Sequence, residues 1–176
     1  MSEKPDMQRL VGDILRPGRI ASVDHGAQRC TVTIGDMTTG PLPWLAMRAG
    51  KLRIWSPPSI GEQCILLCAE GDTNSGFVLP ALYCDAFPAP FSSPDIVALQ
   101  FEDGSAISYD MAARALNLDL VGAATLNVPD GLTINADISL NGTLSTPDDV
   151  VAGGKSLKGH VHSGVQGGTG QTGGPV

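Results

Sequence analysis

The first half of the chain contains short apolar runs separated by turn residues. The runs are GRIASVDH, QRCTVTIGD, GPLPWLAMR, GEQCILLCAE and GFVLPALY. Strands that recur every 8–12 residues or so are typical of a small sandwich or barrel. Five strands in about 75 residues fit an oligonucleotide/oligosaccharide-binding (OB) type barrel. We therefore expect an all-β chain with an N-terminal arm, residues 1–15, and an OB-type barrel, residues 16–95, that ends in the proline-rich CDAFPAPFSSPD.

The second half alternates strictly between apolar and polar residues. From Leu116 to Leu144 almost every even-numbered residue is apolar, and the odd-numbered residues are mostly Asn, Asp, Thr and Ser. A period of two predicts extended β structure, and the Asp103-Gly104 pair before it predicts a hairpin turn.

One chain with a single narrow apolar face cannot close a core, and its strand edges stay open to pairing. We therefore expect residues 96–152 to intertwine with identical chains about a common axis, because closed symmetry removes the open edges. The alternative is an ordinary sheet that packs on the barrel.

Composition and charge narrow the classes of function. The net charge of −7 disfavours nucleic-acid binding. No apolar run reaches the roughly 18 residues of a membrane-spanning helix, and the polar N-terminus lacks a hydrophobic signal region, so we expect synthesis in the cytoplasm. Cys64 and Cys68 lie in an apolar run, and we interpret them as core packing residues with reduced thiols rather than as zinc ligands.

No sequence pattern indicates an enzyme. The acidic residues are scattered and form no catalytic motif, and we interpret His25 as a surface turn residue. The glycines at 168, 170 and 173 match a dinucleotide fingerprint only formally, because no strand precedes them and no helix follows. We interpret Trp44 and Trp55 as packing residues, in the core or in contacts between subunits, rather than as a stacking platform for bases or sugars.

The candidate metal ligands are His160 and His162, in the run GHVHSGVQGG. Their spacing points both imidazoles to one side of an extended strand, but the tail that follows has no Cys, Asp or Glu to complete a site. Three chains that meet at their tips would supply six imidazoles. Six ligands disfavour zinc, and iron(II) suits imidazole nitrogen. The alternative is a pair of solvent-exposed histidines in a glycine-rich tail.

The bonding of such a site also follows from general metal chemistry. A saturated site with no open position would be structural. We expect a neutral Nε2 to bind the metal while a hydrogen bond at Nδ1 fixes the tautomer.

The SLKGHVHSGV run, followed by GGTGQTGGP, resembles the apex of the central spike of contractile phage tails and R-type pyocins, the baseplate assembly protein V family. The runs LPWLAMRAG, SPPSIGEQCILL and GFVLPALYCDAFPAP resemble the N-terminal barrel of that family. The resemblance covers nearly the whole chain. It implies a homotrimer with an OB-type ring, a triple-stranded β-helix over residues 96–152, and an apex, residues 153–176, that contains the HxH motif.

The resemblance also implies a cofactor, partners and a function. It implies one iron ion (Fe²⁺) per trimer, bound by His160 and His162 of each chain; relatives carry other axial ions, which we assign to no residue. The expected function is a membrane-piercing spike, not an enzyme, assembled in the bacterial cytoplasm into the baseplate of a phage virion or pyocin particle. Its N-terminal domain would dock to the baseplate hub and tail tube, and its tip would pass through the target outer membrane.

The alternative function is a trimeric tail module for receptor or glycan binding at the cell surface. Such a module would need exposed aromatic residues on the β-helix, and residues 112–176 contain no Phe, Tyr or Trp.

Overall fold

The computed structural model describes residues 14–68, 71–164 and 168, so most of the predicted arm (1–15) and the end of the predicted apex lie outside the described residues. The chain divides after Ala124 into two compact units, which are described separately below. The strands are β1 (Leu15–Asp24), β2 (Arg29–Ile34), β3 (Met37–Thr38), β4 (Gln63–Leu67), β5 (Phe77–Leu82), β6 (Ile96–Gln100), β7 (Ala106–Asp110), β8 (Ala115–Asp119), β9 (Val151–Ala152) and β10 (Lys155–Ser156). The expectation of a mainly β chain with antiparallel sheets is confirmed. Within the described ranges, no helix has the length and apolar character needed to span a membrane.

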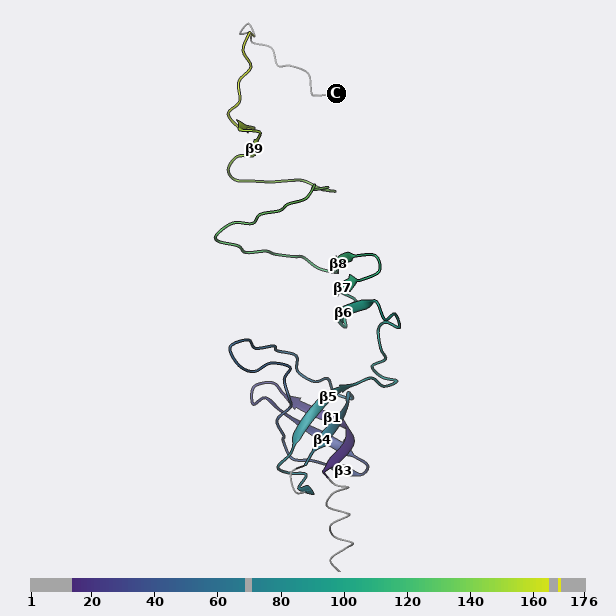
Figure 1. The fold of residues 1–176 in the computed structure, drawn as a ribbon. Helices are drawn as coiled ribbons and strands as arrows, with labels where there is room; N and C mark the ends of the chain where they lie inside the picture. The colour runs from purple at the N-terminus through teal and green to yellow at the C-terminus, as the bar shows by residue number, and fades with distance from the viewer. Residues whose placement is uncertain (1–13, 69–70, 165–167, 169–176) are drawn as a thin grey trace, which may run out of the picture. The chain divides into compact units, whose positions relative to one another are not determined.

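The N-terminal body is a five-stranded antiparallel sheet with the order β3-β2-β1-β4-β5. β1 is the longest strand and pairs with both β2 and β4, so that Ile20 faces Val32 and Gly18 faces Cys64 in the ladder. The register of β1 against β2 shifts between Ile20 and Ser22. A bulge of this kind bends a strand and increases its twist, and Figure 1 shows the sheet curling around itself.

The segment after β3 connects the two sides of this curled sheet. Leu42 exchanges backbone hydrogen bonds with Cys30 of β2, at 2.9 and 2.8 Å. Val78 of β5 donates to the carbonyl of Pro43 at 2.9 Å and accepts from the amide of Leu45 at 2.8 Å. The segment therefore lies between β2 and β5 and closes the sheet into a barrel, which removes open strand edges.

The sequence analysis predicted a strand over GPLPWLAMR, and this prediction is wrong. The run makes isolated bridges to β2 and β5 instead of a ladder. Pro41 and Pro43 have no backbone N–H, and a proline inside a strand removes a ladder hydrogen bond. The other four predicted runs overlap β1, β2, β4 and β5.

The core of the barrel is a small cluster of buried apolar side chains. Its buried members are Ile20, Cys30, Val32, Leu42, Cys64, Leu66, Cys68 and Val78. The interpretation of Cys64 and Cys68 as packing residues is confirmed, since both are buried in the core of the barrel. Burial raises the pKa of Cys30 and Cys64 to about 11.

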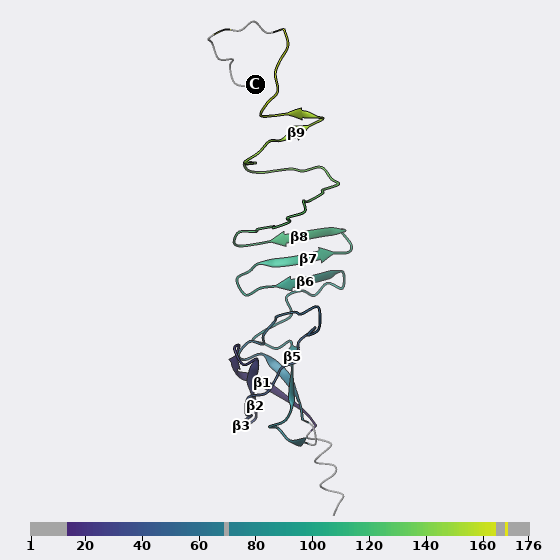
Figure 2. The ribbon, with the colours of Figure 1, turned by 90° about the vertical axis from the view of Figure 1, so that its left-hand side faces the viewer.

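A second, three-stranded antiparallel sheet has the order β6-β7-β8, and Figure 2 shows its strands side by side. The predicted turn at Asp103-Gly104 is confirmed, because it lies in the loop between β6 and β7. Gly104 has a φ of +90° there, a conformation that glycine adopts without steric cost. The carboxylate of Asp103 accepts a hydrogen bond from the amide of Ser105 at 2.8 Å.

The even-numbered apolar residues from Leu116 to Leu144, which we name the apolar stripe, begin in β8 and continue beyond it. Residues 120–150 are all described and contain no strand. Leu126, Ile138 and Leu144 are 70%, 71% and 69% exposed. A single chain therefore leaves the stripe uncovered, and the β-helix expected over residues 96–152 stays a prediction.

Candidate metal site at the apex

A tight hairpin precedes the two candidate histidines. β9 and β10 pair antiparallel and are joined by Gly153 and Gly154, which have φ values of +56° and +77°. Two successive residues with positive φ are the hallmark of a type I′ hairpin turn, and glycine accepts this conformation most readily. The predicted domain boundary between residues 152 and 153 falls inside this hairpin and stays a prediction.

The carboxylate of Asp149 holds the two ends of the hairpin together. Its Oδ1 accepts hydrogen bonds from the amides of Val150 and Lys158, both at 2.9 Å. The amide of Leu157 donates to the carbonyl of Val150 at 2.9 Å. Residues on either side of the hairpin are thus fixed by one carboxylate and one backbone bond.

Ser156 extends this network toward the histidines. Its Oγ accepts a hydrogen bond from the amide of Gly159 at 2.7 Å. A hydrogen bond with the Ser156 side chain and another from the Lys158 amide lower the pKa of Asp149 below its ordinary value of 3.8. Asp149, Ser156 and the Lys158 amide, which we name the apex clamp, therefore form one connected set of hydrogen bonds.

The ring of His160 is held by the backbone of the same loop. Its Nδ1 lies 3.0 Å from the carbonyl oxygen of Leu157. A carbonyl oxygen can only accept, so in the neutral ring Nδ1 carries the proton and Nε2 keeps its lone pair. The side chain is exposed, so Nε2 is accessible to a ligand from outside the chain.

His160 and His162 lie close together, as their spacing predicts. Their ring centroids are 5.1 Å apart and their planes are inclined by 79°. The described residues contain no group of three or more His, Cys, Asp or Glu side chains that could hold a metal. One chain therefore brings two imidazoles together, and any metal site that includes them needs ligands from elsewhere.

The donor set fits a metal that prefers imidazole nitrogen. The hydrogen bond to the Leu157 carbonyl fixes the tautomer of His160 and leaves Nε2 free. Metal-binding histidines typically have such a hydrogen bond at the other ring nitrogen. The sequence analysis expected this hydrogen bond but did not identify Leu157 as its acceptor. It also missed Asp149 and Ser156, although the Gly153-Gly154 pair is a turn signal.

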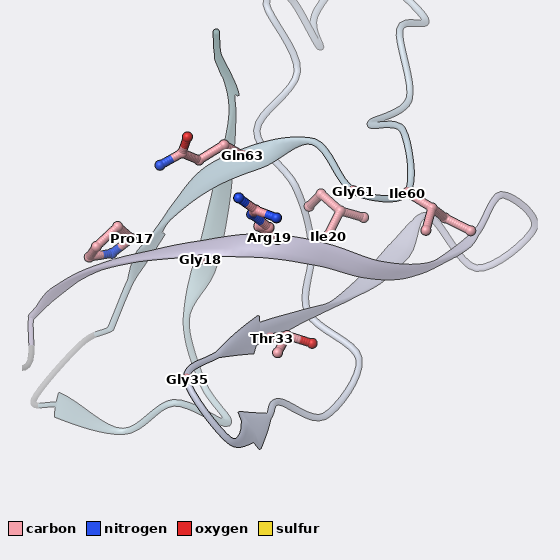
Figure 3. Close-up of a pocket in the computed structure, with 9 residues that line it drawn as sticks. All are labelled: Pro17, Gly18, Arg19, Ile20, Thr33, Gly35, Ile60, Gly61 and Gln63. Carbon is pink, nitrogen blue, oxygen red and sulfur yellow. The ribbon is translucent and has the colours of Figure 1, made fainter. Parts of the chain in front are cut away.

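The barrel has a pocket of about 490 Å³, lined by residues of β1, β2 and β4 and by the turns near them. Figure 3 shows the lining residues. Its lining residues are Pro17, Gly18, Arg19, Ile20, Thr33, Gly35, Ile60, Gly61 and Gln63. The lining offers a guanidinium, a hydroxyl and an amide, and includes no carboxylate, imidazole or thiol. A hydroxyl acts as a nucleophile only beside a general base, and the lining provides no base for Thr33, so this pocket is not a candidate active site.

The remaining candidate residues lie in the barrel. Trp44 packs against the core, which confirms its interpretation as a packing residue. Trp55 lies beside it, with ring centroids 6.0 Å apart, but is 62% exposed in the single chain. His25 is exposed in the turn between β1 and β2, as predicted.

Comparison with known proteins gives matches at both ends of the chain. Residues 16–83 match the family described as the type VI secretion system/phage-baseplate injector OB domain. Residues 156–176, which contain both histidines, match the GpV apex motif. The chain is also similar to the spike protein of Escherichia phage P2, with 34% identity over 150 residues that cover 82% of this chain and 71% of that protein.

Proposed function

The chain belongs to the baseplate assembly protein V family of phage spike proteins, and from this premise we propose that it is a homotrimeric, membrane-piercing central spike. This family is structural and not enzymatic, and its members are components of the phage baseplate. The residue boundaries that we propose are those of the sequence analysis. The barrel over 16–95 forms the ring, residues 96–152 the triple-stranded β-helix, and residues 153–176 the apex.

The observation that carries the proposal is the uncovered apolar stripe. Leu132, Ile134 and Leu140 are 61%, 54% and 57% exposed, in a stretch where the chain pairs with no strand of its own. Burial of one such side chain contributes about 1.5–3 kcal/mol. Two further copies of the same chain provide equivalent stripes, and intertwining also satisfies the backbone groups of residues 120–150 across chains.

The apex motif supports the direction in which the spike points. Residues 159–176 contain no Asp, Glu, Lys or Arg, so a narrow tip built from them enters lipid without the cost of burying charges. The barrel at the opposite end of the sequence then docks to the baseplate hub and the tail tube. We further propose that the trimer assembles in the bacterial cytoplasm and crosses the target outer membrane with its apex first.

In the proposed trimer, His160 and His162 of the three chains hold one iron(II) ion. The ion would supply cross-linking, because it would bind the three chain ends together where termini otherwise fray. The residues of each chain contribute the rest: the Leu157 carbonyl keeps the proton on Nδ1 of His160, which leaves Nε2 as the donor atom. The role proposed for the ion is structural.

The test measures mass and metal together, on protein produced without a histidine tag. Light scattering should give three times 18.2 kDa, and elemental analysis should give one iron per three chains. A folded monomer would overturn the trimer. One metal ion per chain would overturn the shared site and favour a metal-activated enzyme.

A further inference from the structure

The apex clamp forms hydrogen bonds with the backbone next to His160, although none of its groups is a metal ligand in the proposed site. Asp149 lies eleven residues before His160 in the sequence, and the β9–β10 hairpin brings its carboxylate to the Lys158 amide, close to the histidine. Lys158, whose amide Asp149 binds, directly follows Leu157, whose carbonyl holds the His160 ring. The Leu157 carbonyl and the Lys158 N–H belong to one peptide group, so the carboxylate fixes the same peptide that orients the imidazole.

Ser156 provides a second connection. Its Oγ accepts from the Gly159 amide at 2.7 Å, and Gly159 directly precedes His160. The space beside Gly159 is tight, because a Cβ added there would lie 3.2 Å from this Oγ. The clamp thus holds the peptide that contains the His160 ring acceptor and also the peptide that follows it.

We propose that Asp149, acting with Ser156, is a positioning residue for the metal site at His160. The inference depends on the proposed function, since it assumes that the histidines bind iron(II). The carboxylate holds the Lys158 amide and the hydroxyl holds the Gly159 amide, so the Leu157 carbonyl stays in place to accept from Nδ1. The ring therefore remains in the tautomer that presents Nε2.

The test compares Asp149→Ala with Asp148→Ala in the full-length protein. Asp148 is the adjacent carboxylate and is exposed, so its removal is a matched control for the loss of charge. Titration of metal-free protein with Fe²⁺ under argon should show an affinity roughly 10- to 100-fold lower in Asp149→Ala, the usual effect of losing an outer-shell partner. Asp148→Ala should bind as the unsubstituted protein does.

A second readout does not depend on the metal. In metal-free protein labelled with ¹⁵N-histidine, the shifts of Nδ1 and Nε2 report the tautomer of each ring. The unsubstituted protein should show His160 with its proton on Nδ1, and Asp149→Ala should show a mixture of tautomers. Asp149→Asn keeps a carbonyl oxygen that accepts from both amides, so it should restore the single tautomer and most of the Fe²⁺ affinity.

Ser156→Ala gives an independent variant in case Asp149→Ala does not fold, and it should lower the Fe²⁺ affinity in the same direction. Equal affinities and equal tautomers in Asp149→Ala and Asp148→Ala would overturn the inference and leave the metal site intact. A trimer of the unsubstituted protein that binds no Fe²⁺ would overturn the metal site itself, and the inference with it.

Discussion

The barrel and the apolar stripe differ in where their apolar side chains find partners. In the barrel, strands far apart in the sequence return to one another, and Val32, Leu66 and Val78 are completely buried within one chain. In the part of the stripe beyond β8, the chain pairs with no strand of its own, and Leu126, Ile138 and Leu144 are about 70% exposed. The comparison shows that an apolar pattern forms a core within one chain only where the chain folds back on itself.

The largest expected effect is on assembly through the stripe. Replacing both Leu132 and Ile134 with Asp should abolish the trimer, because six carboxylates would face a closed axis. The control pair, Thr133→Asp with Asn135→Asp, places the same charges at odd-numbered positions and should leave the trimer intact. Light scattering measures both. If the variant with Asp at Leu132 and Ile134 still formed a trimer, the stripe would not hold the chains together, and the proposed contrast with the barrel would be wrong.

The next effect concerns the core of the barrel. Leu66 is completely buried, so Leu66→Ala should lower the free energy of unfolding by about 2–5 kcal/mol. Because this core lies within one chain, the loss should be the same at every protein concentration. Urea unfolding followed by tryptophan fluorescence measures it, since Trp44 and Trp55 both lie in the barrel half. A strong concentration dependence would show that the barrel also needs its neighbours.

A smaller effect is expected where two strands approach closely. A Cβ at Gly18 would lie 2.5 Å from Cγ1 of Val32 and 2.9 Å from the Thr33 carbonyl. Gly18→Ala should therefore destabilise the barrel by about 1–3 kcal/mol through overpacking. Gly50→Ala is the control, because nothing lies within 4 Å of its Cβ position. Equal melting temperatures for the two variants would contradict the close approach of β1 and β2.

The smallest effect concerns pH. Burial raises the pKa of Cys30 and Cys64 from 9.0 to about 11. The folded state thus favours the protonated thiols, and their contribution to stability is complete below pH 9.0 and lost as the pH rises through about 11. The melting temperature of the barrel should fall over this range, and replacing both cysteines with alanine should reduce the slope.

The same thiols predict a pattern of chemical reactivity. At pH 8 iodoacetamide should modify Cys84 first, because Cys84 is only half-buried whereas Cys30, Cys64 and Cys68 are buried. Mass spectrometry counts the modified residues, and protein unfolded in urea should react at all four. Rapid modification of Cys64 in the folded protein would contradict its burial.

The sequence predicted those parts of the fold that depend on neighbouring residues. Alternation and turn signals located β1, β2, β4 and β5, and they located the turn at Asp103-Gly104. The strand expected around Pro43 failed because the closing contacts of the barrel are made by single residues, which no periodic pattern records.

The candidate site also has one part that the sequence predicted and one part that it did not. The spacing of His160 and His162 was sufficient to predict that their rings lie together, because two residues in an extended chain share a face. The apex clamp was not predictable, since Asp149 and the Lys158 amide are nine positions apart and meet only through the geometry of the Gly153-Gly154 turn. A pattern of side chains contains no information about such backbone partners.

The exposed stripe has a consequence for how the protein is made. The barrel leaves the ribosome first and can fold at once from its own residues, since N-terminal domains generally fold during synthesis. In the proposed trimer the stripe folds only with two further chains, so the rate of its folding depends on how often chains meet. Until the chains associate, the exposed apolar residues and unpaired backbone groups can bind other proteins or aggregate. Translation of several chains from one messenger RNA would shorten this period.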